Sequence, residues 1–180
     1  MRSLTEVADQ ELLWTPSPEQ KKTYELRAGD EVAATVRFER SSLAIAEVSD
    51  TIWTFKREGF WHPRVTVRLA GSETDLAIFQ PSWSGSGTLK LSPVRQIQWK
   101  SANFWHSSWI WQQQDVDGHP LVRFKSRQKW TKMEGEVAIA ATATELVELP
   151  LLVTLGWYLL VLLAQDTAAT AATTVAVTGA

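Results

Sequence analysis

The sequence contains no cysteine, and this absence removes several classes of protein from consideration. It excludes a fold held by disulfide bonds, thiolate zinc sites and a cysteine nucleophile, and it is compatible with a reducing compartment. The first ten residues also lack the apolar stretch of a signal peptide, because Glu6 and Asp9 interrupt them. We therefore predict a cytoplasmic location. Peripheral attachment to a membrane is compatible with it.

A large excess of either charge is absent too. The 18 Lys and Arg residues stand against 20 Asp and Glu residues, which gives a net charge of −2 at pH 7. This balance excludes a protein that coats nucleic acid through an overall basic surface, and it excludes an acidic tail protein. With 180 residues, 44% of them hydrophobic, the chain is long enough for one domain with its own core.

That domain is predicted over residues 21–166, after a polar lead-in over residues 1–20. From Lys22 to Thr142 apolar and polar residues alternate, and turn residues recur every eight to twelve positions, which is typical of a β-sandwich or β-barrel. Eleven strands are predicted, or twelve if Glu11–Trp14 adds an edge strand. They are Thr23–Arg27, Glu31–Phe38, Leu43–Val48, Ile52–Lys56, Arg64–Leu69, Leu76–Gln80, Thr88–Leu91, Arg95–Trp99, Ser108–Gln113, Leu121–Ser126 and Glu136–Thr142.

One long helix is predicted, over residues 145–165, and its core is apolar on every face. Leu149–Gln165 carries no charge across 17 residues, which fits either a buried core helix or a short membrane span. No Lys or Arg follows Lys132 to anchor a span at a membrane surface. A closed barrel of about twelve strands, in turn, is too wide for its own side chains to fill. We therefore predict a mainly β fold, a closed antiparallel β-barrel around this helix, with a disordered tail over residues 167–180; a C-terminal membrane anchor is the alternative.

This arrangement, together with three phrases of sequence, resembles the tubby C-terminal-like superfamily. The phrases are Tyr24–Asp30 (Tyr-Glu-Leu-Arg-Ala-Gly-Asp), Gly87–Leu91 (Gly-Thr-Leu-Lys-Leu) and Leu155–Leu160 (Leu-Gly-Trp-Tyr-Leu-Leu). The resemblance covers about residues 22–165, is strongest to small uncharacterised bacterial members, and extends to the LURP-one-related proteins and phospholipid scramblases. It implies a twelve-stranded barrel around a hydrophobic helix. The scramblases' palmitoylated cysteine cluster and acidic calcium loop have no counterpart here, so the resemblance implies no activity.

Residue patterns that would carry chemistry are few. His62, His106 and His119 form no pair with metal-ligand spacing, and no Gly-x-Ser-x-Gly elbow holds a serine nucleophile. We predict no catalytic residue, no metal site and no cofactor, and hence a protein that is not an enzyme.

Aromatic residues are abundant, with ten Trp in the chain. Most are predicted to fill the barrel around the helix. Two similar triplets, Phe60-Trp61-His62 and Phe104-Trp105-His106, fall at turn-like positions. The alternative for Trp61 and Trp105 is a place on the barrel rim, facing a membrane surface or a ligand.

Basic residues gather in one stretch. Between Leu76 and Met133 there are eight Lys and Arg residues and two Asp residues, 8 − 2 = +6. Within it Arg123, Lys125, Arg127 and Lys129 alternate with other residues, so that one continuous strand would place all four on one face. Such a basic stripe either binds anions or is an ordinary solvated strand face.

The predicted function is a non-catalytic binding or scaffold domain that contacts anionic phospholipid headgroups through this basic stripe. The phosphoinositide-binding members of the tubby superfamily support it by analogy only. The alternative is a membrane protein anchored by its C-terminal helix. A nucleic-acid partner is disfavoured because the rest of the chain is acidic, and a monomer is expected.

Overall fold

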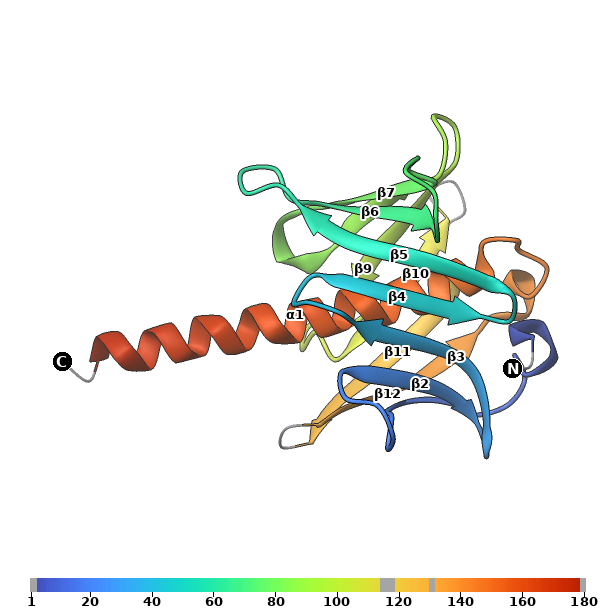
Figure 1. Ribbon diagram of the computed structural model, residues 1–180, viewed down its shortest axis with the longest axis horizontal. Helices are drawn as coiled ribbons and strands as arrows, with labels where there is room; N and C mark the ends of the chain where they lie inside the picture. The colour runs from blue at the N-terminus through green and yellow to red at the C-terminus, as the bar shows by residue number, and fades with distance from the viewer. Residues whose placement is uncertain (1–2, 114–118, 130–131, 179–180) are drawn as a thin grey trace.

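The computed structural model describes residues 3–113, 119–129 and 132–178. Twelve strands in this part of the chain form one closed barrel (Figure 1), in which every strand pairs antiparallel with its sequence neighbours and β1 closes the ring against β12. The predicted closed antiparallel barrel is thus confirmed. The strands are β1 (Leu12–Pro16), β2 (Thr23–Ala28), β3 (Glu31–Phe38), β4 (Leu43–Val48), β5 (Thr51–Glu58), β6 (Arg64–Leu69), β7 (Ala77–Pro81), β8 (Gly87–Lys90), β9 (Gln96–Ser101), β10 (Ser108–Gln113), β11 (Pro120–Lys129) and β12 (Lys132–Ile139).

The strand boundaries differ from the prediction mainly at the last hairpin. β11 continues to Lys129 and β12 begins at Lys132, where we expected strands ending at Ser126 and beginning at Glu136. The pairing extends from Val122 opposite Ile139 to Lys129 opposite Lys132. Hydrogen bonds across the hairpin keep its charged end extended, although that end has no apolar alternation to mark it as a strand.

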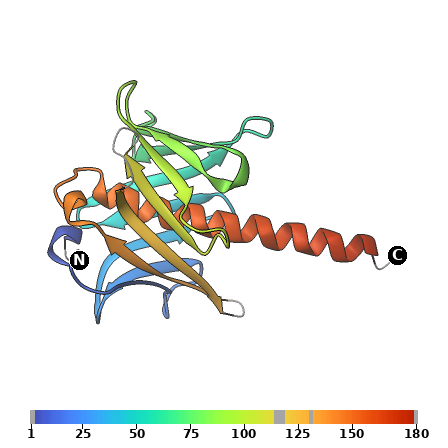
Figure 2. The ribbon, with the colours of Figure 1, turned by 180° about the vertical axis from the view of Figure 1, so that it is seen from behind.

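One α-helix lies in the described residues: α1 (Leu149–Thr178) passes through the barrel and projects from one end, as both views show (Figures 1 and 2). Residues 149–162 are buried apart from Pro150, which is half-buried, and residues 165–173 are exposed. The helix begins at Leu149 and not at residue 145, because a short 3₁₀ helix, η3 (Ala141–Ala143), and a turn precede it.

The predicted disordered tail over residues 167–180 is wrong as far as Thr178, because α1 continues to that residue. Alanine has the highest helix propensity of any residue, and it recurs throughout this segment. The hydroxyls of Thr167, Thr170 and Thr173 donate to the carbonyls four residues earlier, at 2.8, 2.9 and 3.0 Å. Composition alone suggested disorder, but the segment extends an existing helix and needs no nucleation of its own.

α1 is also long and apolar enough, over Leu149–Thr173, to cross a membrane by length and composition. However, 72% of its most apolar 18-residue window is buried within the protein. A core helix passes the same test, so the length of α1 is weak evidence for a span.

The fit between helix and barrel depends on close contacts at Gly156. A Cβ built on Gly156 would overlap the ring of Phe124 and lie 2.9 Å from Trp111 Nε1. Trp111 Nε1 in turn donates to the carbonyl of Leu152 at 2.8 Å. A small residue at position 156 therefore lets two large aromatic rings of the wall reach the helix backbone.

Candidate functional site

The end of the barrel from which α1 projects is called here the exit rim. Because neighbouring strands are antiparallel, every connection that follows an odd-numbered strand lies at this end. The described loops at this end are residues 17–22, 39–42, 59–63, 82–86 and 102–107. The opposite end carries the remaining described connections, residues 3–11 and the turn before α1.

Two loops of the exit rim present large aromatic side chains to solvent. Phe60 and Trp61 are 88% and 85% exposed, and Phe104 and Trp105 are 86% and 81% exposed. The two rings of each pair pack edge to face, with centroids 5.3 and 5.5 Å apart. Single exposed apolar residues are ordinary, but paired aromatic rings at two loop tips on one end of a barrel are typical of a contact surface.

The chain holds the first pair outward through a turn at Gly59. This residue has φ +85°, and a Cβ there would lie 2.5 Å from the carbonyl oxygen of His62. Only glycine fits such a closely folded loop at low cost, and Phe60 and Trp61 form its tip.

Asn103 holds the second pair. Its Oδ1 accepts the backbone N–H groups of Ser107 and Ser108 at 3.1 and 3.2 Å, and its Nδ2 donates to Ser107 Oγ at 2.8 Å. Phe104 and Trp105 lie within this closed loop, so a defined hydrogen-bond network orients them.

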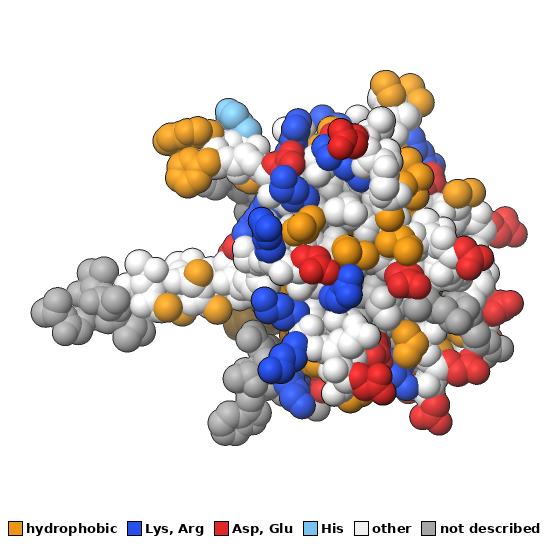
Figure 3. Space-filling view, viewed as in Figure 1, with side chains coloured by type: hydrophobic (Ala, Val, Ile, Leu, Met, Phe, Trp, Pro, Cys, Tyr) orange, Lys and Arg blue, Asp and Glu red, His pale blue; other side chains and the backbone are white. Residues whose placement is uncertain are grey.

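Charge divides the molecule between its two ends. Counting the loops, the two terminal residues of each strand at this end and Asp166, the exit rim has eight cations and four carboxylates with described side chains, a net charge of +4. By the same count, with residues 3–11 and 140–148 included, the opposite end has four cations and eleven carboxylates, net −7. Figure 3 shows Lys and Arg along the edge of the barrel beside α1, and Asp and Glu at the end of the barrel away from the projecting helix. The exit-rim cations are Lys21, Lys22, Arg37, Arg40, Arg57, Arg64, Lys100 and Lys132.

Five of these eight cations have no carboxylate within 4.0 Å among the described residues; the other three are paired. Arg57 binds Asp166 through both terminal nitrogens, at 2.7 and 3.1 Å, and this hydrogen bonding raises the pKa of Arg57. Lys21, Lys22, Arg40, Lys100 and Lys132 are the unpaired ones. The exit rim therefore keeps positive charge that the protein itself does not neutralise.

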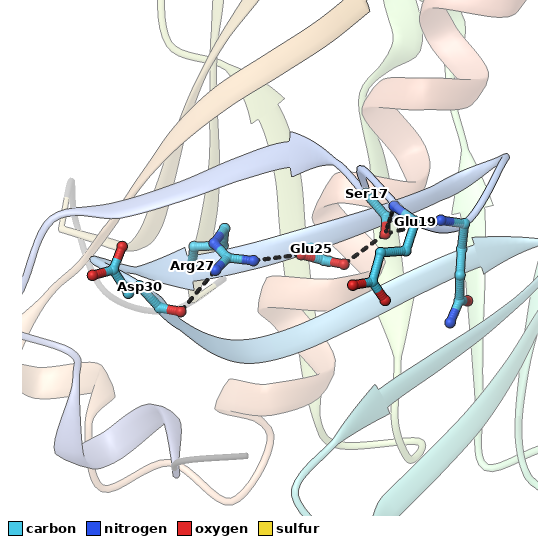
Figure 4. A network of polar contacts seen from close by, with 6 residues as sticks. Ser17, Glu19, Glu25, Arg27 and Asp30 are labelled. Carbon is cyan, nitrogen blue, oxygen red and sulfur yellow. Dashed lines mark hydrogen bonds and ion pairs between the residues drawn. The ribbon is translucent and has the colours of Figure 1, made fainter.

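A polar network on the outer face of β2 holds the loop that carries Lys21 and Lys22 (Figure 4). Ser17 Oγ donates to Glu25 at 2.6 Å, and Arg27 donates both to Glu25 at 2.6 Å and to the carbonyl of Asp30 at 2.7 Å. Both carboxylate oxygens of Glu25 are thereby occupied. This network is structural, and its contribution to the site is to fix the start of the 17–22 loop.

The predicted basic stripe lies on one strand, as expected, but carboxylates face it. Arg123, Lys125 and Arg127 are exposed on β11, and the side chain of Lys129 lies outside the described part of the structure. Across the hairpin, Lys125 lies opposite Glu136, and a nitrogen of Arg127 lies 3.8 Å from Glu136. Glu134 and Glu136 follow Met133, beyond the basic stretch, and the pairing of β11 with β12 places them opposite the stripe.

Sequence reasoning placed Trp61 and Trp105 on a rim only as an alternative, and it did not find the exit-rim cations. These cations come from loops and strand ends that are far apart in the chain, and the closure of the barrel brings them to one end. In the described residues, no group of three or more His, Asp or Glu side chains is arranged to hold a metal ion.

No protein-family model, curated protein or solved structure matches this chain. The resemblance to the tubby superfamily thus stays a prediction, and the function has to be argued from the site itself.

Proposed function

We propose that this protein is a non-catalytic binding domain that docks on anionic membrane surfaces through its exit rim. The observation that carries the proposal is the coincidence of two exposed Phe–Trp pairs with a net charge of +4 at one end of the barrel. Trp and Phe rings enter the interface between lipid headgroups and acyl chains, and cations are attracted to anionic headgroups. The contact surface differs from the one expected, because the basic stripe is partly neutralised.

The energies favour reversible binding. Transfer of a Phe side chain out of water contributes about 1.5–3 kcal/mol, and each cation near an anionic surface contributes about 1 kcal/mol. Partial burial of the four rings, with five unpaired cations, therefore suffices for a measurable affinity that falls as salt screens the charges.

The projecting half of α1 suits the same orientation. A membrane that meets the exit rim also meets this helix, and no charged residue follows Asp166. The hydroxyls of Thr167, Thr170 and Thr173 bond back to the helix, so their donors do not depend on water when the helix contacts lipid.

Vesicle co-sedimentation tests the proposal. The wild-type chain should bind vesicles that contain phosphatidylglycerol and bind pure phosphatidylcholine vesicles much less. Replacing Phe60, Trp61, Phe104 and Trp105 with Ser should lower binding at least about tenfold, by loss of ring burial. A matched control replaces Val94 and Val147 with Ser. These two side chains are 94% and 92% exposed at the opposite end, and their replacement should leave binding unchanged. Absence of wild-type binding, or equal binding by the rim variant, contradicts the proposal.

A further inference from the structure

A cavity of about 500 Å³ opens at the exit rim between α1 and the barrel wall. Leu160, Leu163 and Ala164 of α1 form one side, and Trp109 and Met133 of the wall form the floor. This volume lies within the usual range of about 300–1,000 Å³ for small-molecule sites. The cavity is therefore large enough for a ligand and lies where the aromatic tips and cations gather.

Three small residues on three elements leave this space open. Along β11 the inward positions are Val122, Phe124 and Ser126, so the row ends in a small side chain just where α1 leaves the barrel. Ala164 faces the same space from the helix, and Gly85 faces it from the loop after β7. A Cβ on Gly85 would lie 3.1 Å from the Trp109 ring and 3.3 Å from Leu163.

The interior of the cavity is apolar and its mouth is polar. Trp109 and Leu160 are 1% and 2% exposed, and the only polar atom of the Trp109 side chain, Nε1, already donates to the carbonyl of His106 at 3.0 Å. Its ring therefore offers the cavity a purely apolar surface. Ser84 and His106, at the mouth, both have left-handed backbones, with φ of 72° and 52°. Non-glycine residues in this conformation are uncommon and concentrate at functional sites.

A smaller cavity of about 270 Å³ continues around the helix. It shares Gly85 and Leu163 with the first, and Phe79, Leu159 and Leu162 line it. Leu163 borders both cavities, so mainly apolar space follows α1 on both sides of this residue, and the Arg57–Asp166 pair lines the smaller cavity as well. An elongated ligand fits such a space better than a compact one.

We infer that the larger cavity takes up one aliphatic chain that ends in an anionic group, with the chain against Trp109, Leu160 and Met133 and the anion at the rim. Lys132 does not line the cavity, but it directly precedes the lining residue Met133 at the exit rim, is exposed and has no described carboxylate partner, so its positive charge favours an anion near the mouth. The inference rests on the proposed membrane docking and deepens it, because a docked barrel would hold one lipid by its chain and not only by its headgroup.

Titration of the full chain with single-chain lipids below their micelle concentration tests the inference, with calorimetry as the readout. We expect one palmitoyl lysophosphatidylglycerol per chain. Ala164→Trp and Ser126→Leu, which fill the cavity, should each weaken binding at least about tenfold. The matched control is Ala168→Trp, one turn further along α1, where the side chain is exposed and outside the cavity lining. Circular dichroism and urea unfolding of each variant establish that it is folded.

Further titrations distinguish a free fatty acid from a lysolipid as the ligand, and they distinguish this inference from the proposed membrane docking. Palmitate that binds as well as the lysolipid identifies a free fatty acid as a sufficient ligand, whereas tighter lysolipid binding identifies the phosphate headgroup. Equal binding of zwitterionic lysophosphatidylcholine overturns the anionic requirement, and unchanged binding by folded Ala164→Trp and Ser126→Leu overturns the site. A wild type that binds anionic vesicles but no single-chain lipid contradicts only this inference, while one that binds the lipid but no vesicle contradicts only the docking.

Discussion

Arg57 and Asp166 form a two-point ion pair, with N–O distances of 2.7 and 3.1 Å, where α1 leaves the barrel. The pair divides the helix into two parts with different surroundings. Most residues before it are buried in the barrel, and none after it carries a charge. The charged side chain nearest the outer half of α1 is therefore neutralised at the level of the exit rim, which lets the rim and residues 167–178 of the helix meet one surface.

We expect Asp166→Asn to lower the free energy of unfolding by no more than about 1 kcal/mol, because exposed ion pairs are screened by solvent. The two side chains are 33% and 54% exposed. Urea unfolding in low and high salt measures the effect, and Arg57→Gln with the double variant completes the cycle. A loss above about 2 kcal/mol would show that the pair holds α1 in the barrel.

Gly156→Ala should destabilise the protein, although alanine favours helices by about 1 kcal/mol over glycine. The added methyl group would overlap the Phe124 ring and crowd Trp111, and overpacking a core costs about 1–3 kcal/mol. Combining it with Phe124→Leu, which removes the ring, should recover part of the loss. Chemical denaturation measures both, and a more stable Gly156→Ala variant would contradict the packing described.

The central position of α1 gives a sharper contrast between two acidic substitutions. Leu155→Asp should abolish cooperative folding, because Leu155 is 0% exposed and a buried unpaired charge costs several kcal/mol. Ala171→Asp, on the exposed half of the same helix, should unfold with the wild-type midpoint. Near-ultraviolet circular dichroism and urea titration report on both. Cooperative unfolding of Leu155→Asp would be incompatible with a helix inside the barrel.

Tyr158 makes stability depend on pH at the alkaline end. Its hydroxyl donates to the carbonyl of Ser42 at 2.6 Å, and burial raises its pKa above the ordinary value of 10.0. The folded protein therefore keeps the phenol proton where the unfolded chain loses it, so stability is intact below about pH 10 and falls as pH rises above it.

Tyr158→Phe should cost about 0.5–1.5 kcal/mol near neutral pH through the lost hydrogen bond. The loss should lie at the low end, because the Ser42 carbonyl still accepts the backbone N–H of Arg57 at 3.2 Å. Above about pH 10 the gap between variant and wild type should narrow. Urea midpoints at both pH values measure it, and a gap that widens in alkali would mean that the phenol is not held neutral.

The sequence allowed the barrel to be predicted because most strands carry their own alternation of apolar and polar residues. It did not reveal the ends of the last hairpin, because the pairing of Lys129 with Lys132 depends on the partner strand. The helical state of residues 167–178 was missed for a related reason: an Ala/Thr segment has little pattern of its own, and its helix grows from the buried half of α1.

The candidate site could be predicted only in part. Trp105 and Trp109 are four residues apart in an aromatic-rich segment, yet one is 81% and the other 1% exposed. The difference arises from the Asn103 network, which closes the loop before β10 begins. The net charge of the exit rim depends on which loops the barrel brings together, which no local pattern records.

The basic stripe provides a graded test of where the membrane lies. Arg123 is near the opposite end of β11 and Arg127 is near the exit rim, while both are exposed on the same strand face.

If the rim docks on lipid, Arg127→Gln should weaken binding to phosphatidylglycerol vesicles by up to about fivefold, corresponding to about 1 kcal/mol per cation. Arg123→Gln should change it less than twofold, because charges beyond the screening length of about 10 Å contribute little. Both variants remove the positive charge but keep a polar side chain, and they avoid a repulsive carboxylate beside Glu136. Co-sedimentation at two salt concentrations gives the comparison. Equal losses from both variants would place the membrane along the whole outer face of β11, and the docking surface would then be the stripe and not the rim.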